Sequence, residues 1–193
     1  MRLGGRLFRH RTWLPLPIVL ALLLIPSGPS TPSLLWAGAA VVSAGELLRL
    51  WAVRHIGVIS RTRSDRLGPL ISSGPFGWVR NPLYIGNLAL WVGFTLSAGP
   101  VWLLPPIVVL LAIEYHAIVR WEEGLLLTRL GDTYRLYTSR VPRWVPGRSG
   151  GARPHVPHDA RRTFSWAETL FSERGTLVAL GAGYFLLWIK HQI

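Results

Sequence analysis

Residues 81–113 decide the fold class, and they read NPLYIGNLALWVGFTLSAGPVWLLPPIVVLLAI. This stretch contains no Asp, Glu, Lys or Arg, and neither does the stretch 12–45. A helix needs about 20 residues to cross a hydrocarbon core of about 30 Å, so each stretch is too long for one crossing. Gly and Pro interrupt both stretches near the middle, at 26–32 and at 97–100. Each stretch therefore predicts a hairpin of two transmembrane helices.

The composition of the chain agrees with a membrane protein. Of 193 residues, 50% are hydrophobic and only 16% are charged, and the formal net charge is +12. A basic soluble chain would favour nucleic acid, but this apolar content favours a lipid environment. The chain has no Cys, which excludes disulfides, Cys-ligated zinc and thiol nucleophiles. We expect an all-α, polytopic helical membrane protein with no nucleic-acid partner.

The expected helices divide the chain into four parts. The first hairpin pairs 13–25 with 34–53 in an N-terminal unit 1–55, and the second pairs 83–96 with 101–119 in a core 56–146. A basic linker 147–165 leads to a C-terminal apolar unit 166–193. Its most apolar part, 176–189, is about 21 Å long at ~1.5 Å per residue. It is either a short fifth span or an interfacial helix.

The basic residues predict the orientation of these helices. Arg residues precede the first span, lie between the hairpins and follow the fourth span, whereas both hairpin tips have none. The positive-inside rule places the N-terminus, the middle segment and the tail in the cytoplasm, with contacts to anionic membrane lipids. We expect an integral protein of a bacterial inner membrane. The alternative for 1–25 is a cleaved signal peptide, but the apolar stretch 34–42 favours an uncleaved first span that pairs with it.

The segment 74–86, GPFGWVRNPLYIG, is the first candidate for chemistry. Pro82 disfavours a helix at Asn81 but suits a first turn, so the third span is predicted to start near Leu83. Arg80 and Asn81 then lie at a helix N-terminus, which suits an anion. The alternative is that Arg80 reaches lipid headgroups, Asn81 caps the helix and Tyr84 anchors it at the interface.

The second candidate segment is 120–137, RWEEGLLLTRLGDTYRLY. Leu126, Leu130 and Tyr134 follow one another at intervals of four, which predicts an amphipathic helix at the membrane surface. Glu122 and Glu123 stand where this helix would meet the fourth span. A carboxylate there could hold a cationic ligand group. The alternative is a surface network of Arg and Glu, which contributes little.

Together the two segments resemble the membrane methyltransferases, a superfamily that includes the isoprenylcysteine carboxyl methyltransferases and the phospholipid methyltransferases. The resemblance covers about 61–146. The residues that carry it are Gly74-Pro75-Phe76, Arg80-Asn81-Pro82-Leu83-Tyr84-Ile85-Gly86, Glu122-Glu123, Leu130-Gly131-Asp132-Thr133-Tyr134, Tyr137, Val141-Pro142-Arg143 and Pro146.

This resemblance implies an enzyme that binds S-adenosylmethionine at the cytoplasmic face and methylates a lipophilic acceptor. The acceptor would be the carboxylate of an isoprenylcysteine-like compound or a lipid amine. By similarity, the residues around the cofactor pocket are Gly68, Pro69, Leu70, Ile71, Phe76, Asn81, Pro82, Leu83, Tyr84 and Glu122, with Arg61 a weaker candidate. The candidates for catalysis or acceptor positioning are Glu122, Glu123, Arg120 and Arg80. No metal site is predicted.

One departure from the family concerns Asn81, because the family often has His before the proline. Asn can replace an imidazole as a neutral hydrogen-bond partner but cannot take up a proton. A member that keeps the cofactor but has lost turnover is therefore one alternative. Another is a non-enzymatic membrane scaffold or assembly protein. The oligomeric state stays open.

Two further patterns lie inside apolar segments. Glu46 precedes Arg49 by three residues, so we expect a local ion pair rather than catalysis. Gly181 and Gly183 interrupt the C-terminal apolar segment, which predicts close helix packing there.

Overall fold

The computed structural model describes residues 2–10, 13, 15–26, 31–57, 70–146 and 163–192. Every regular element in these ranges is helical, which confirms the predicted all-α class. The elements are α1 (Arg2–His10), α2 (Leu16–Leu24), α3 (Pro32–Ile56), η2 (Gly74–Gly77), α4 (Pro82–Ala98), η3 (Val101–Leu103), α5 (Leu104–Leu130), α6 (Asp132–Arg140) and α7 (Trp166–Lys190).

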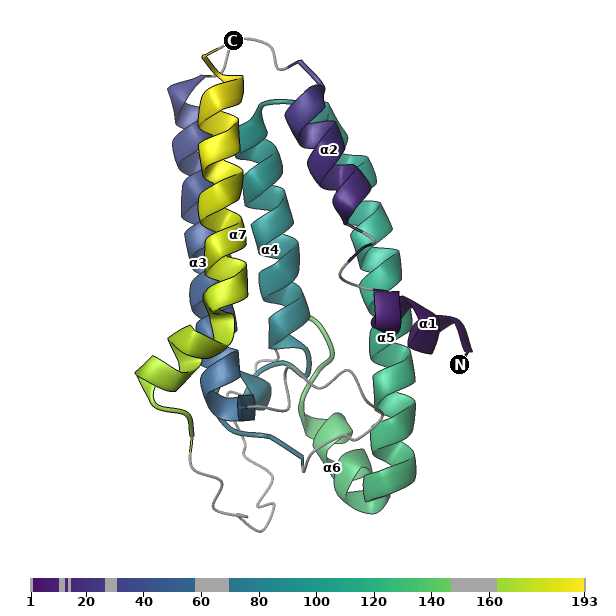
Figure 1. The fold of residues 1–193 in the computed structure, drawn as a ribbon. Helices are drawn as coiled ribbons and strands as arrows, with labels where there is room; N and C mark the ends of the chain where they lie inside the picture. Colours follow the sequence, from purple (N-terminus) through teal and green to yellow (C-terminus); the bar gives the residue numbers. More distant parts are fainter. Residues whose placement is uncertain are drawn as a thin grey trace.

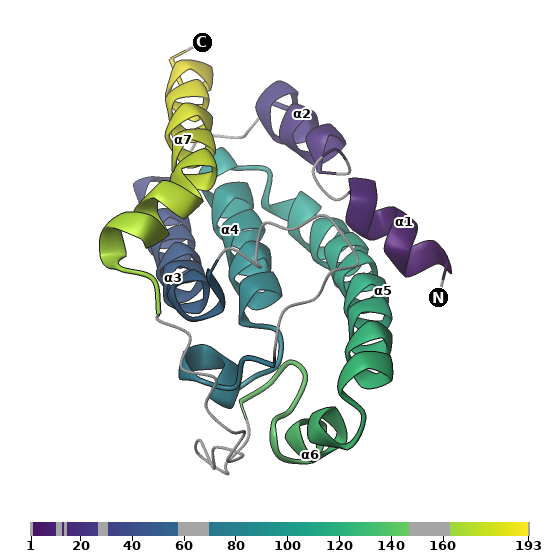
Figure 2. The ribbon, with the colours of Figure 1, turned by 60° about the horizontal axis from the view of Figure 1, so that its bottom comes forward.

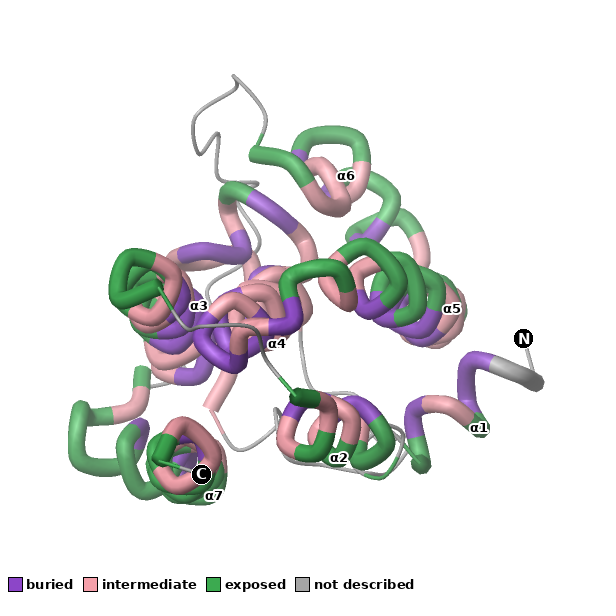
Figure 3. Tube along the Cα trace, turned by 90° about the horizontal axis from the view of Figure 1, so that it is seen from above, coloured by how far each residue is buried: buried purple, intermediate pink, exposed green. Residues whose placement is uncertain are grey.

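Four long helices, α3, α4, α5 and α7, form an up-and-down bundle (Figure 1). The lower end of the bundle is the end at which α4 begins and α6 lies. Seen along the bundle, α4 is central, and the exposed residues of α3, α5 and α7 face outward (Figure 3). α4 thus touches both of its neighbours in the chain, α3 and α5.

Two helical stretches are long and apolar enough to cross a membrane: Pro32–Ile56 and Val101–Leu130. In the most apolar 18-residue stretch of each, only 22% and 28% of the residues are buried. Large apolar side chains such as Trp36 and Ile113 therefore face outward. An apolar surface of this extent suits lipid better than water. α4 is a shorter apolar helix of 17 residues.

Glycines bring α3 and α4 into close contact. A Cβ atom on Gly38 would lie 2.4 Å from the carbonyl oxygen of Gly93, and one on Gly45 would lie 2.9 Å from that of Gly86. The two glycines of each helix are seven residues apart, so they lie on one face about two turns from each other. Small residues allow helix backbones to approach closely, which is a common way of packing helices in membranes.

Bulkier residues fill the other side of α4. Phe94 of α4, Leu111, Tyr115 and Ile118 of α5, and Leu187 of α7 belong to one buried cluster. The rings of Tyr84 and Tyr115 also meet across α4 and α5, with centroids 5.2 Å apart. This side of α4 is therefore an aromatic and aliphatic core.

α7 lies beside α3 and extends beyond the predicted segment 176–189. It begins with a capping box, in which Ser165 and Glu168 each satisfy a backbone N–H of the other. At its far end Lys190 donates to the carbonyl oxygens of Leu22 and Ala98, at 2.7 and 3.3 Å. The glycines of this helix differ from each other: Gly183 packs on the ring of Phe94 as predicted, whereas a Cβ atom on Gly181 would meet no atom within 4 Å.

The predicted first span, 13–25, is wrong in length. Among its described residues only Leu16–Leu24 is helical, and nine residues rise about 13 Å at ~1.5 Å each, which is too short to cross a membrane. The main contacts of α2 are with α4 and α7, not with α3, so the expected first hairpin does not form. The preceding residues form α1, which packs on α5 where Gly4 meets Ala117 and Trp121.

The predicted surface helix through 126–137 is also wrong, because the chain turns at Gly131. Gly131 has φ +52°, a conformation that glycine adopts without strain. Leu126 and Leu130 belong to the end of α5, and Tyr134 belongs to α6. The three side chains still pack together, because α6 folds back on α5.

Candidate active site

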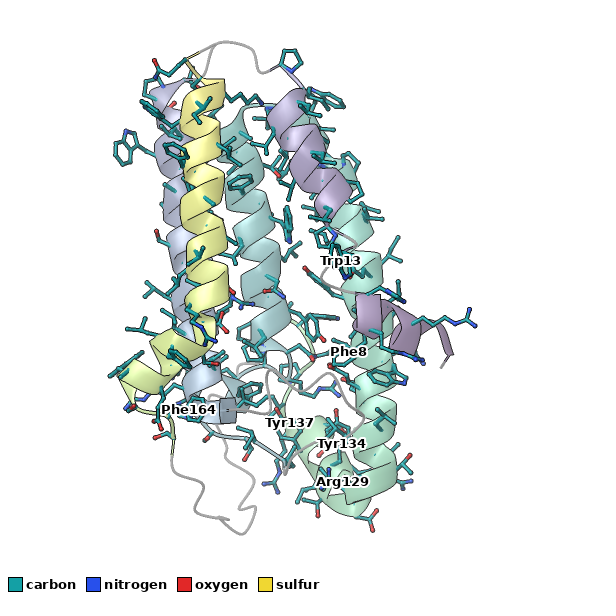
Figure 4. The ribbon with its side chains drawn as sticks, in the orientation of Figure 1. Phe8, Trp13, Arg129, Tyr134, Tyr137 and Phe164 are labelled. Atoms are coloured by element: carbon teal, nitrogen blue, oxygen red, sulfur yellow. The ribbon has the colours of Figure 1, made fainter. Side chains whose placement is uncertain are left out.

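The segment before α4 is fixed by α6. Pro75 and Phe76 are buried in the short helix η2, and the hydroxyl of Tyr137 donates to the carbonyl oxygen of Phe76 at 2.7 Å. Tyr134, Tyr137 and Val141 form a small buried cluster, on which the half-buried Leu70 packs. Figure 4 shows the two tyrosines at the lower end of the bundle, where they point inward from α6. η2 and α6 therefore form one packed unit.

The first residues of α4 are tied to the segment that follows α6. As predicted, the helix begins at Pro82, directly after Asn81. The side chain of Asn81 makes no cap; its Nδ2 donates to the carbonyl oxygen of Arg143 at 3.1 Å. The backbone N–H of Arg80 donates to the carbonyl oxygen of Pro142 at 2.9 Å. Figure 2 shows this lower end, where the chain returns from α6 toward the start of α4.

Tyr84 and Glu122 join the two segments that carry the sequence motifs. The hydroxyl of Tyr84, in the first turn of α4, donates to Oε1 of Glu122 on α5 at 3.1 Å. The two residues are 38 positions apart in the chain, and both are half-buried. The predicted cofactor residues on either side of the second hairpin thus lie together in space.

Glu123 holds two guanidinium groups. Nη1 of Arg80 lies 2.9 Å from its Oε1, and Arg143 reaches both carboxylate oxygens, with Nε at 3.0 Å and Nη2 at 2.6 Å. The bidentate contact fixes the carboxylate geometrically, and it raises the pKa of Arg143. With two positive charges and one negative charge, this group of three leaves an excess of one positive charge beside Glu122.

Two tyrosines next to this group stay protonated far above neutral pH. Burial and the negative charge of Glu123 raise the pKa of Tyr134 to about 12, although the positive charge of Arg80 opposes the shift. Burial raises the pKa of Tyr137 as well. Both phenols therefore act here as neutral hydrogen-bonding groups.

A buried nitrogen of this group of three has no hydrogen-bond partner among the described residues. Nε of Arg80 is buried and donates to no other described residue. A buried N–H that donates no hydrogen bond is costly, and an anionic ligand group would satisfy it. The carboxylate of Glu122, the residue before Glu123 in the chain, suits a cationic group. This set of donors and acceptors fits S-adenosylmethionine, whose amino-acid part carries an ammonium and a carboxylate.

The structure brings together only some of the predicted site residues. The residues that meet at the lower end are Phe76, Arg80, Asn81, Pro82, Tyr84, Glu122 and Glu123. Ile71 and Leu83 are close to these residues in the sequence and are half-buried. Arg120 is exposed on α5. The predictions for Arg61, Gly68 and Pro69 lie outside the described residues. All these roles stay predictions.

Sequence reasoning missed one residue of the site and two polar residues of the bundle. Arg143 belongs to a motif, but the motif predicts no role for it, and in the structure it pairs with Glu123. Asn87 and Glu173 were not singled out, although both contact Arg49 in the bundle. Polar or ionisable residues inside apolar segments are the pattern that could have identified them. Among the described residues, no three His, Cys, Asp or Glu side chains are grouped so that they could hold a metal ion.

Comparison with known proteins gives the family. The model of the phospholipid methyltransferase family matches residues 33–133, which is more than half of the chain, and the chain belongs to this family. The match covers α3, α4 and α5 and stops at the start of α6. Membership implies methyl transfer to lipophilic substrates.

Two curated relatives are named for metal resistance and not for methyl transfer. The nickel-cobalt-cadmium resistance protein NccN of Alcaligenes xylosoxydans xylosoxydans is 29% identical over 153 residues, which is 75% of this chain and 68% of the relative. The cobalt-zinc-cadmium resistance protein CzcN of Cupriavidus metallidurans is 27% identical over 116 residues, which is 60% of this chain and 50% of the relative. The comparison with solved structures found no significant match.

Proposed function

We propose that the protein is an S-adenosylmethionine-dependent methyltransferase that modifies a lipophilic acceptor at the cytoplasmic face of a membrane. The hydrogen bond between Tyr84 and Glu122 carries the proposal, because it joins the two motif segments of the family at one place. Family membership supports methyl transfer. The basic residues near the lower end of the bundle support a cytoplasmic orientation for that end.

In this proposal the cofactor is held by opposite charges. Glu122 pairs with the ammonium group of the cofactor, and Nε of Arg80, which has no partner among the described residues, donates to its carboxylate. When bound, S-adenosylmethionine supplies an electrophilic methyl group on a sulfonium. Asn81, Pro82 and Leu83 surround the bound molecule at the start of α4. Glu123 acts indirectly, because it pairs with Arg80 and is itself fixed by Arg143.

The acceptor can be of two kinds, and the residues serve each in a different way. A carboxylate, as in an isoprenylcysteine-like compound, needs no base, so alignment and exclusion of water supply the acceleration. A lipid amine must lose a proton, and Glu122, Glu123 and Tyr84 are the candidates for the base. Tyr84 and Glu122 are in contact, so one of them can take the proton while the other faces the cofactor. Asn81 cannot act as the base, because a side-chain amide takes up no proton near neutral pH. Arg120, exposed on α5, is placed to meet an anionic headgroup.

The test is binding of S-adenosylmethionine to the full-length protein in detergent, measured by calorimetry. We expect wild type to bind, Glu122→Gln to lose at least about tenfold in affinity because an ion pair is removed, and Tyr84→Phe to lose less. The matched control is Glu168→Gln, a carboxylate in the exposed capping box of α7, where glutamine keeps the box.

Two outcomes would contradict the proposal. If folded wild type binds no S-adenosylmethionine in detergent or in lipid vesicles, the non-enzymatic scaffold becomes the better account. If Glu122→Gln binds as well as Glu168→Gln does, the carboxylate of Glu122 does not hold the cofactor.

The names of the two relatives favour a second proposal, that this methyl transfer contributes to tolerance of divalent transition metals. Growth of a strain that lacks the protein should then be restored on cobalt, nickel or cadmium by wild type but not by Glu122→Gln. If wild type and Glu122→Gln restore growth equally, metal tolerance does not depend on methyl transfer.

A further inference from the structure

A buried cluster of charged and polar side chains lies between α3, α4 and α7, at the level of the second turn of α4. Its centre is Arg49 of α3. Nε of Arg49 donates to Glu46 at 3.2 Å, Nη1 donates to Asn87 of α4, and Nη2 donates to Glu173 and, at 3.2 Å, to Thr176, both on α7. The predicted pair of Glu46 and Arg49 is thus confirmed, but it is one part of a network that joins three helices.

The network leaves Arg49 little freedom. Only 12% of its side chain is exposed, and the side chains of Glu46 and Glu173 are 8% and 6% exposed. Two carboxylates around one guanidinium hold it strongly where water is scarce, and removing one partner leaves a buried charge uncompensated. The planar guanidinium can serve several partners at fixed angles, which a lysine ammonium cannot do.

Arg49 reaches its partners by crossing α4 at a glycine. A Cβ atom on Gly86 would lie 2.5 Å from Cγ of Arg49, so any larger residue would displace the arginine. Gly86 and Asn87 come two and three residues after Tyr84, in the same turn of the same helix. A contact that fixes Gly86 and Asn87 therefore also fixes the direction in which Tyr84 points.

α7 supplies two of the partners, although it lies outside the residues that the family model matches. Glu173 and Thr176 are one turn apart on the face of α7 that meets α3. Near the lower end, Phe164 donates its N–H to the carbonyl oxygen of Arg54 at 2.9 Å, and Arg54 stacks on Trp166. The C-terminal helix is thus held to α3 at two levels.

We infer that Arg49 is a positioning residue for methyl transfer, which orients α4 so that Tyr84 meets Glu122, and that α7 takes part in this through Glu173 and Thr176. The inference rests on the proposed function. It assigns a role in the reaction to a helix that the family match does not include.

The test compares matched variants by their affinity for S-adenosylmethionine. Arg49→Lys, which keeps the charge but loses most of the fixed contacts, should weaken binding by about tenfold, as loss of a supporting partner commonly does. Thr176→Val should weaken it less. The control is Thr169→Val, also on α7, whose hydroxyl donates to the carbonyl oxygen of the N-cap Ser165 at 2.9 Å and to no other helix among the described residues. This control should bind as wild type does.

A double variant shows whether Arg49 acts through Tyr84. In the Tyr84→Phe background, Arg49→Lys should reduce the affinity for S-adenosylmethionine clearly less than it does in wild type. The reason is that the contact between Tyr84 and Glu122, which Arg49 supports, is already gone. Full additivity of the two losses would overturn the inference, and so would unchanged binding by both Arg49→Lys and Thr176→Val. If Arg49→Lys fails to fold, the affinities of Thr176→Val and Thr169→Val decide the test, because both are mild changes.

Hydrogen exchange of the first turns of α4, measured without cofactor, separates the two proposals. Faster exchange in Arg49→Lys and Thr176→Val than in Thr169→Val supports the inference. If wild type binds the cofactor but these exchange rates and affinities are unchanged, the inference fails and the proposed function stands. If wild type does not bind, both the proposed function and a positioning role in it are overturned.

Discussion

The two faces of α4 are built from different residues. Toward α3 it presents Gly86 and Gly93, which lie opposite Gly45 and Gly38, and the two backbones nearly touch. Toward α5 it presents larger groups, among them Tyr84, whose ring lies 5.2 Å from that of Tyr115. The first interface leaves no room for adjustment, whereas the second has bulky side chains and, at its lower end, charges.

This difference shows how a helical bundle can carry a site. The α3–α4 pair has few alternative arrangements, because any shift would bring backbone atoms into collision. α4 and α5 separate toward the lower end of the bundle (Figure 1), where Tyr84 and Glu122 meet between them and Glu123 pairs with Arg80 just before α4. A rigid interface on one side of α4 thus holds a polar interface on the other. Each of the following predictions tests one part of this comparison.

The largest effect is expected at the glycine interface. Gly38→Leu would place a Cβ atom 2.3 Å from Oγ of Ser97 and 2.4 Å from the carbonyl oxygen of Gly93. Overpacking of this kind should lower the free energy of unfolding by about 3 kcal/mol or prevent folding. The control is Gly181→Leu in α7, where no atom lies within 4 Å of the added Cβ position. Equal stability of the two variants, by thermal unfolding in detergent, would refute the close contact.

A smaller effect is expected at the polar interface. Glu123→Gln removes the ion pairs to Arg80 and Arg143 and should lower the free energy of unfolding by about 2 kcal/mol, because these hydrogen bonds are charged and mostly shielded from water. It should also weaken cofactor binding. Asp132→Asn is the control, since Asp132 pairs with Arg135 only at 3.9 Å on the surface. A Glu123 variant as stable as this control would contradict the assignment.

The smallest effect is a pH dependence. The pKa of Tyr134 is raised to about 12 in the folded protein, against about 10 for an ordinary tyrosine. Between these values the unfolded chain gives up the proton and the folded chain keeps it, so stability is complete below about pH 10 and falls as pH rises toward 12. Tyr134→Phe should make this fall shallower, measured by unfolding at several pH values. An identical slope in wild type and variant would show that Tyr134 is not shielded.

Much of the fold could be predicted from the uncharged stretches. Their length and their Gly and Pro breaks predicted helices, the start of α4 near Leu83 and the pairing of Glu46 with Arg49. The errors came where a local pattern was compatible with two structures. The apolar spacing through Leu126, Leu130 and Tyr134 suits one long helix, but Gly131 turns the chain and the same residues then meet across two helices.

The candidate site was predicted as a set of residues, but not as a geometry. The motif segments identified Tyr84, Glu122 and Glu123, because their residue types and order are those of the family. Nothing in the sequence paired Glu123 with Arg143, or Asn81 with the carbonyl oxygen of Arg143. Residues that lie 20 or 62 positions apart meet only after the helices have packed.

The sequence by itself determined that this chain is helical, apolar and a member of its family, since these properties depend on composition, periodicity and local motifs. Tertiary structure alone decided which helices are neighbours, because this depends on which surfaces fit. α2 meets α4 and α7 instead of α3, and α7 contributes Glu173 to the network around Arg49. A buried arginine requires partners, and only the folded bundle shows from which helices they come.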